Sequence, residues 1–172
     1  TPAGRLNYVD LVAEAQPVRD AARNGEALAG IFYTGGTTGF PKGVILPHRA
    51  LWTSAVCFGS GGSVTADDRT LHAAPMFHIA GSAMLFSLTT FGGSHVFIPG
   101  FEPSAFLKAM RAHKPTITQL VPTMIGMLLQ HPDLEQTDTS SLTRLIYGAS
   151  PITQAILKEA MAKMPEPRFI PA

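Results

Sequence analysis

The residues with the clearest chemical potential lie in one short segment, Tyr33–Gly43, whose sequence is YTGGTTGFPKG. Glycine lets consecutive backbone N–H groups face one point, and it lets a ligand approach the main chain closely. Threonine hydroxyls add donors around the same point, and Lys42 adds a full positive charge. This combination of residues predicts a loop that binds a polyphosphate.

This segment differs from the phosphate-binding loop of the common NTPases. That loop requires Gly immediately before Lys and then Ser or Thr. Here Pro41 precedes Lys42, and Gly43 follows it. A flexible Gly/Thr hairpin that binds nothing is the structural alternative, but it accounts poorly for the whole string. We therefore favour phosphate binding by a loop of another type.

The segment is similar to the signature loop of the adenylate-forming enzymes, which include acyl-CoA synthetases, adenylation domains of peptide synthetases and beetle luciferases. The family usually has Ser at the position of Gly35. Further segments follow in the family's order, namely Pro75–Gly81 (PMFHIAG), Val121–Thr123 (VPT) and Tyr147–Pro151 (YGASP). By this resemblance the first two line the acyl pocket and the last lies against the adenine. The resemblance runs from about Leu28 to the C-terminus.

The resemblance implies a reaction in two steps. A carboxylate attacks the α-phosphate of ATP to give acyl-AMP and pyrophosphate, and a thiol, usually that of coenzyme A, then displaces AMP. Charge develops on the phosphates in the first step, so positioning and electrostatic stabilisation should dominate catalysis. ATP, Mg²⁺ and coenzyme A are the implied cofactors. The implied nucleotide-binding residues are Thr34, Gly35, Gly36, Thr37, Thr38, Gly39, Lys42, Gly148, Ala149, Ser150 and Pro151.

His78 is the second expected catalytic residue, beside Lys42. A lone histidine near apolar residues is more often structural. His78, however, follows Phe77 at an expected strand-to-helix junction, and the carboxyl ends of strands are where open α/β sheets bind ligands. We therefore predict that it contacts the carboxylate or the acyl group of the substrate and does not bind a metal.

The Phe77–His78 pair also favours one branch of the family. Amino-acid-activating relatives typically carry Asp after the aromatic residue, whereas an imidazole suits a substrate that has only a carboxylate. A fatty acid is the first expectation for the substrate and an aromatic acid the second. Two alternatives from other classes remain: a phosphotransferase or NTPase, which would release phosphate, and a non-catalytic nucleotide-binding module.

The remaining candidates have structural explanations. Gly148–Ser150 can be an ordinary strand-to-helix turn with Ser150 as the N-cap. No pair of the other histidines shows a spacing suited to metal ligands, so no zinc site is expected. The carboxylate that usually binds Mg²⁺ in the family would lie beyond Ala172, as would other catalytic motifs, so these residues alone should not complete adenylation. The expected plain core residues are Met84, Phe86, Met124, Met127 and Leu128.

Strands and helices are expected to alternate along the chain. Strands are expected over residues 28–33, 43–46, 70–74, 95–98, 116–121, 144–147 and 168–170, and helices over 8–14, 47–58, 79–91, 103–111, 122–130 and from 151 onward. The first strand should be buried because its residues are apolar. Repeated strand–helix units predict an α/β fold with a mostly parallel sheet flanked by helices. By resemblance, residues 1–172 are part of a large N-terminal AMP-binding domain, without the C-terminal domain.

Composition excludes several other classes of protein. Of the 172 residues, 45% are apolar and 15% are charged, as in a globular domain, and the net charge of +1 gives no footprint for nucleic acid or an anionic membrane. No apolar run is long enough to span a membrane. The single cysteine, Cys57, excludes an internal disulfide and suits a cytoplasmic location. The resemblance also admits a homodimer.

Overall fold

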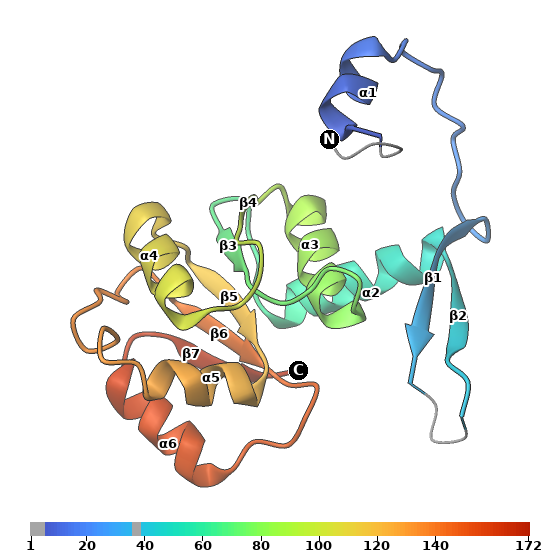
Figure 1. Cartoon of the computed structure of the whole chain (residues 1–172). Coiled ribbons are helices and arrows are strands. Elements are labelled where there is room, and N and C mark those ends of the chain that lie inside the picture. The colour runs from blue at the N-terminus through green and yellow to red at the C-terminus, as the bar shows by residue number, and fades with distance from the viewer. Residues whose placement is uncertain (1–5, 36–38) are drawn as a thin grey trace.

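The structure is a computed structural model that describes residues 6–35 and 39–172. Its strands β3 (Arg69–His72), β4 (Ser94–Phe97), β5 (Ile117–Leu120), β6 (Arg144–Tyr147) and β7 (Arg168–Pro171) form one parallel sheet. The order across this sheet is β4-β3-β5-β6-β7 (Figure 1). The prediction of an α/β fold with a mostly parallel sheet is confirmed.

Helices cover both faces of the sheet. One face is covered by α2 (His48–Gly61) and α3 (Ile79–Phe91), and the other by α4 (Pro103–His113), α5 (Pro122–Leu129) and α6 (Gln154–Lys163) (Figure 1). On the first face Leu88 packs with Ile117, and on the second Leu107 packs with Leu145. Successive side chains of a strand point to opposite faces, so the short central strands supply both cores.

The helix α4 shows how local sequence defines an element. The carboxylate of Glu102 caps its start by accepting hydrogen bonds from the N–H groups of Ser104 and Ala105, at 3.1 and 2.8 Å. Pro103 occupies the first turn, where no N–H is needed. The helix ends at His113, where Lys114 adopts a left-handed conformation with φ of 48°. The predicted helix is confirmed and extends two residues beyond the expected range of 103–111.

β1 (Leu28–Thr34) and β2 (Lys42–Pro47) form an antiparallel hairpin that is separate from the parallel sheet (Figure 1). The prediction that the first strand is buried is wrong, because Ile31 is 50% exposed and Tyr33 is 70% exposed. Apolar composition correctly indicated a strand, but two strands alone cannot surround their own side chains. The preceding helix α1 (Tyr8–Glu14) also has no buried residue.

The expected core residues divide into two groups. Met84 and Leu128 are almost fully buried, as predicted, and Met124 packs at the edge of the larger core. Met127 is 50% exposed, so its assignment to the core is wrong. Met127 precedes Leu128 on α5, and neighbouring residues of a helix point in different directions, so only part of this apolar helix faces the sheet.

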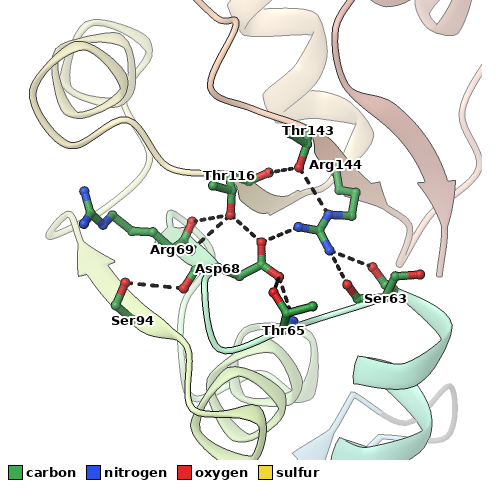
Figure 2. A network of polar contacts seen from close by, with 9 residues as sticks. Ser63, Thr65, Asp68, Arg69, Ser94, Thr116, Thr143 and Arg144 are labelled. Carbon is green, nitrogen blue, oxygen red and sulfur yellow. Dashed lines mark hydrogen bonds and ion pairs between the residues drawn. The ribbon is translucent and has the colours of Figure 1, made fainter.

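A buried polar network joins the amino ends of three strands (Figure 2). Asp68, which precedes β3, accepts hydrogen bonds from the N–H of Thr65 at 2.8 Å and from the hydroxyl of Thr116 at 2.6 Å. It also forms an ion pair with Arg144 of β6, whose guanidinium donates to the carbonyl oxygen of Ser63 after α2. The network therefore fixes the edge of the sheet that lies opposite the carboxyl ends of its strands.

Candidate functional site

The strand order creates a switch point at the carboxyl edge of the sheet. From β3 the chain passes to β4 on one side, and it then crosses to β5 on the other side of β3. Open α/β sheets bind ligands at such points, because the connections diverge and leave a crevice. Pro75–Gly81 follows β3, Val121–Thr123 follows β5, and Gly148–Pro151 follows β6. The three segments singled out in the sequence therefore lie along one edge, after adjacent strands.

His78 is the N-cap residue of α3, at the predicted junction between strand and helix. Its side chain makes no capping hydrogen bond, but its backbone carbonyl accepts from the N–H and the hydroxyl of Ser82, at 3.1 and 3.0 Å. The imidazole is exposed and lies 4.7 Å from the ring of Phe77, measured between ring centres. The helix thus fixes the backbone of His78 and leaves its ring accessible to a ligand.

Gly81 allows the first turn of α3 to pack against the loop that precedes it. A Cβ atom at Gly81 would lie 2.4 Å from the carbonyl oxygen of Pro75 and 3.2 Å from that of Ala74. These are backbone atoms, so they can yield only if the loop moves. The N–H of His78 donates to the same Pro75 carbonyl at 3.3 Å. Gly81 is therefore required by the close approach that holds His78 in place.

We expect Gly81→Ala to destabilise the protein by about 1–3 kcal/mol, because the added methyl group overpacks this contact. It should also displace His78 and lower activity. Gly126→Ala is the matched control, since a Cβ atom at Gly126 in α5 would meet nothing within 4 Å. That change should be neutral or stabilising by up to about 1 kcal/mol. Urea unfolding of both variants measures the difference, and equal stabilities would contradict the packing role of Gly81.

The predicted phosphate loop connects β1 and β2. Thr34 lies opposite Lys42 in the hairpin, and its hydroxyl donates to the Lys42 carbonyl oxygen at 3.4 Å. Gly39 has a φ of +114°, which favours glycine. A Cβ atom at Gly35 would meet nothing within 4 Å, so this position can accept a side chain such as the serine usual in the resembled loop. Gly36, Thr37 and Thr38 lie outside the described residues.

A recess of about 560 Å³ joins this hairpin to the start of α3. Tyr33 of β1 borders it on one side, and Met76, Phe77 and His78 border it on the other. The strand that leads into the phosphate loop and the predicted catalytic imidazole therefore share one recess. No local sequence pattern indicates this arrangement, because it depends on where the hairpin lies relative to the start of α3.

A second cavity, of about 750 Å³, shares Met76 and Phe77 with that recess. It extends past the carboxyl ends of β3 and β4 to Met124 of α5, and its walls are mostly apolar. Met124 directly follows the predicted Val121–Thr123 segment. The two cavities together could accommodate a molecule with a polar end near His78 and an apolar body.

The structure also reveals a histidine pair that the sequence analysis missed. His72 and His95 lie on the adjacent strands β3 and β4, with Nε2 of His72 2.9 Å from Nδ1 of His95. Burial, with a smaller contribution from His95, lowers the pKa of His72 to about 4, and burial also lowers the pKa of His95. Both rings are therefore neutral near pH 7. Their sequence spacing carries no signal, because only strand pairing brings them together.

The Gly148–Pro151 segment leaves the carboxyl end of β6 as a loop, in which Gly148 is half-buried and residues 149–151 are exposed. The prediction that Ser150 is the N-cap of the next helix is wrong: α6 begins at Gln154, and the hydroxyl of Thr153 accepts a hydrogen bond from the N–H of Ile156 at 3.3 Å. Ala149 has a φ of +65°, which is uncommon for a residue with a side chain and typical of constrained functional loops. Ser150 therefore lies in the loop between β6 and α6, before the helix terminus.

Residues 6–35 and 39–172 contain neither a metal-binding cluster nor a helix suited to cross a membrane. No group of three or more His, Cys, Asp or Glu side chains is placed to hold a metal ion within these ranges. No helix in the same ranges has both the length and the apolar character that a membrane crossing requires.

A family model described as AMP-binding enzyme matches residues 3–171. Among curated proteins, the chain is 37% identical over 160 residues to the medium/long-chain-fatty-acid–CoA ligase FadD8 of Mycobacterium tuberculosis, which covers 90% of this chain and 28% of that protein. It is 30% identical over 176 residues to 4-coumarate–CoA ligase 2 of Oryza sativa, which covers 98% of this chain and 31% of that protein. The chain thus spans less than a third of the length of these relatives.

Solved structures give a consistent result. The N-terminal domain of FACL13 from Mycobacterium tuberculosis, determined with an inhibitor, has a TM-score of 0.87 at 25% identity, covering 95% of this chain and 41% of that one. ATP-bound MatB from Rhodopseudomonas palustris has a TM-score of 0.82 at 31% identity, covering 94% of this chain and 33% of that one. The hairpin and the five-stranded sheet therefore occur together in larger proteins of known structure.

Proposed function

The chain belongs to the AMP-binding enzyme family, and we propose that it is part of an ATP-dependent acid–thiol ligase. In the proposed reaction a carboxylic acid is converted to acyl-AMP and then to acyl-CoA. The observation that carries this proposal is the shared recess, in which Tyr33 at the base of the phosphate loop borders the same space as His78. The names of the similar curated proteins, which are CoA ligases, support it.

Each candidate residue has a distinct role in this proposal. Lys42 and the backbone donors around Gly39 hold the β- and γ-phosphates, since the lysine supplies charge and the glycine allows close approach. His78 contacts the carboxylate of the acid, and the apolar cavity beyond Phe77 takes the acyl body. The loop Gly148–Pro151 lies against the adenine. The site residues thus position two reactants, which is the main requirement when the attacking carboxylate already carries its charge.

Mg²⁺ and coenzyme A complete the proposed reaction. Mg²⁺ prefers oxygen ligands and is often bound largely through the phosphates of a nucleotide. Coenzyme A would supply the thiol that displaces AMP. The acid is a fatty acid or an aromatic acid, and the relatives named above include a ligase for each class.

A screen of pyrophosphate release tests the proposal. The full-length protein is incubated with ATP, Mg²⁺ and acids of varied length and ring content, and acyl-AMP is trapped with hydroxylamine. We expect pyrophosphate and a trapped hydroxamate with at least one acid, and no release without acid. Release of inorganic phosphate in place of pyrophosphate would favour a phosphotransferase or NTPase. Binding of ATP without release of either product would favour a non-catalytic module.

A further inference from the structure

The cavity that lies beyond Phe77 contains a buried polar group. Among the described residues that line it, His72 alone carries a hydrogen-bonding side chain, and this residue is only 5% exposed. The surrounding residues include Met76, Phe97 and Phe101. Pockets of this type obtain most of their affinity from apolar walls and their specificity from a few fixed polar groups. The orientation and protonation of His72 therefore matter for what the cavity can bind.

A chain of hydrogen bonds assigns the tautomer of His72. The hydroxyl of Thr89 donates its proton to the carbonyl oxygen of Leu85 at 2.8 Å. With its proton placed on Leu85, we assign the hydroxyl oxygen as the acceptor of the Nε2–H of His95, which lies 3.2 Å away. In a neutral ring, Nδ1 of His95 then carries no proton and accepts from Nε2–H of His72 at 2.9 Å. Nδ1 of His72 is left as an unprotonated acceptor, without a hydrogen-bond partner among the described residues.

Stacking holds the ring of His72 in this position. Its centre lies 4.6 Å from that of Phe97 on β4, with only 10° between the two planes. His72 and Phe97 are partners in the parallel register of β3 and β4, so the backbone itself sets the stack. Burial lowers the pKa of His72 to about 4, which keeps the acceptor unprotonated over the physiological range.

We infer that His72 is a specificity-determining residue of the cavity, and that it accepts a hydrogen bond from a hydroxyl group on the acyl or aryl body of the acid. This inference rests on the proposed function. A purely apolar wall discriminates weakly between acids, whereas an acceptor fixed in that wall disfavours an acid that leaves it unpaired. The relay from Thr89 through His95 keeps the acceptor on the correct nitrogen. The chain should therefore activate a hydroxylated acid in preference to its unsubstituted parent.

The test compares matched pairs of acids in the full-length protein. The pairs are octanoic acid with its hydroxyoctanoic acids and cinnamic acid with its hydroxycinnamic acids, and kcat/KM is measured by pyrophosphate release. In His72→Phe we expect the ratio of kcat/KM for the preferred hydroxylated acid to kcat/KM for its parent acid to fall about tenfold. A change of this size corresponds to the loss of one hydrogen bond. The parent acid should lose little, because phenylalanine retains the stack with Phe97.

Two neighbouring threonines provide a matched control that leaves the cavity intact. Thr89 and Thr90 each donate to a carbonyl oxygen one turn back in α3, at 2.8 and 2.7 Å, but only Thr89 contacts His95. Thr89→Val should weaken the preference for the hydroxylated acid, and Thr90→Val should retain it. The inference would be overturned if wild type, His72→Phe and Thr89→Val showed the same preference for the hydroxylated acids. It would also be overturned if wild type preferred the parent acid in every pair. Activation of no acid at all would overturn the proposed function itself.

Discussion

Replacement of Lys42 by alanine in the full-length enzyme is expected to slow acyl-AMP formation by about 100- to 1,000-fold, the loss typical of one preorganised group that stabilises transition-state charge. Lys42 begins β2, where the hairpin pairs it with Thr34 and the side chain is exposed. Negative charge shifts onto the leaving pyrophosphate as the acid attacks, so a cation at this position contributes most in the transition state. Single-turnover measurement of acyl-AMP formation gives the rate directly.

The matched control for this prediction is Lys108→Ala. Lys108 is exposed on α4, which covers the face of the sheet opposite α2 and α3. Its removal changes the net charge by the same amount and should leave the rate within about twofold, because exposed charges far from the phosphates are screened by salt. If Lys42→Ala and Lys108→Ala had the same rate as wild type, the hairpin would not be the phosphate-binding loop.

The largest expected loss of stability comes from Asp68→Ala, at about 3–5 kcal/mol in the free energy of unfolding. Asp68 is 3% exposed and forms an ion pair with Arg144, whose side chain is 14% exposed (Figure 2). Removal of the carboxylate leaves the guanidinium partly buried without its counter-charge, and it leaves the hydroxyl of Thr116 without its acceptor. Urea unfolding followed by near-ultraviolet circular dichroism measures the loss.

The contribution of Asp68 should also depend on pH. Burial alone would raise its pKa, but hydrogen bonds from Thr116 and the Thr65 N–H, together with Arg144, outweigh burial and lower the pKa. A lowered pKa in the folded state means that the stabilisation is complete above the unfolded value of about 3.9 and is lost as pH falls through the folded value. Asp68→Ala should therefore differ most from wild type near neutral pH and least in strong acid.

Asp67→Ala separates this effect from a general loss of negative charge. Asp67 precedes Asp68 but is exposed, and no ion pair involves it within the described part of the chain. Its removal should change stability by less than about 0.5 kcal/mol. Because the network lies at the amino ends of the strands, ATP binding by folded Asp68→Ala should match that of wild type. If Asp68→Ala were about as stable as Asp67→Ala, the ion pair between Asp68 and Arg144 would contribute little to the stability of the fold.

Much of this architecture could be predicted from local patterns. The helix at 79–91 matches α3 at both ends, and the strand at 144–147 matches β6, because apolar spacing and flanking glycine or proline act over a few residues. Motifs that require a particular residue type also indicated local structure. The glycine of PMFHIAG is required by a contact only a few residues away, between Gly81 and Pro75. Such short-range contacts restrict the residue type at a position, so they can be recognised from the sequence.

The errors arose where neighbours in space decided the outcome. The apolar residues of β1 indicated a buried strand, yet Ile31 and Tyr33 are exposed because the hairpin stands apart from the sheet (Figure 1). Ser150 has the right chemistry for an N-cap, but Thr153 takes that position after a longer loop. Residue type states what a side chain can do, whereas packing determines whether a partner is present.

By itself, then, the sequence determined the α/β class, the order of the segments and the family that they resemble. Only the tertiary structure decided which of them lie together: Tyr33 and His78 border one recess, His72 lies within hydrogen-bonding distance of His95, and Asp68 forms an ion pair with Arg144. Each of these arrangements depends on strand order or on the position of the hairpin, which arise from interactions between distant parts of the chain. A local pattern cannot encode them, because the same strands could pair in another order without any change in their own periodicity.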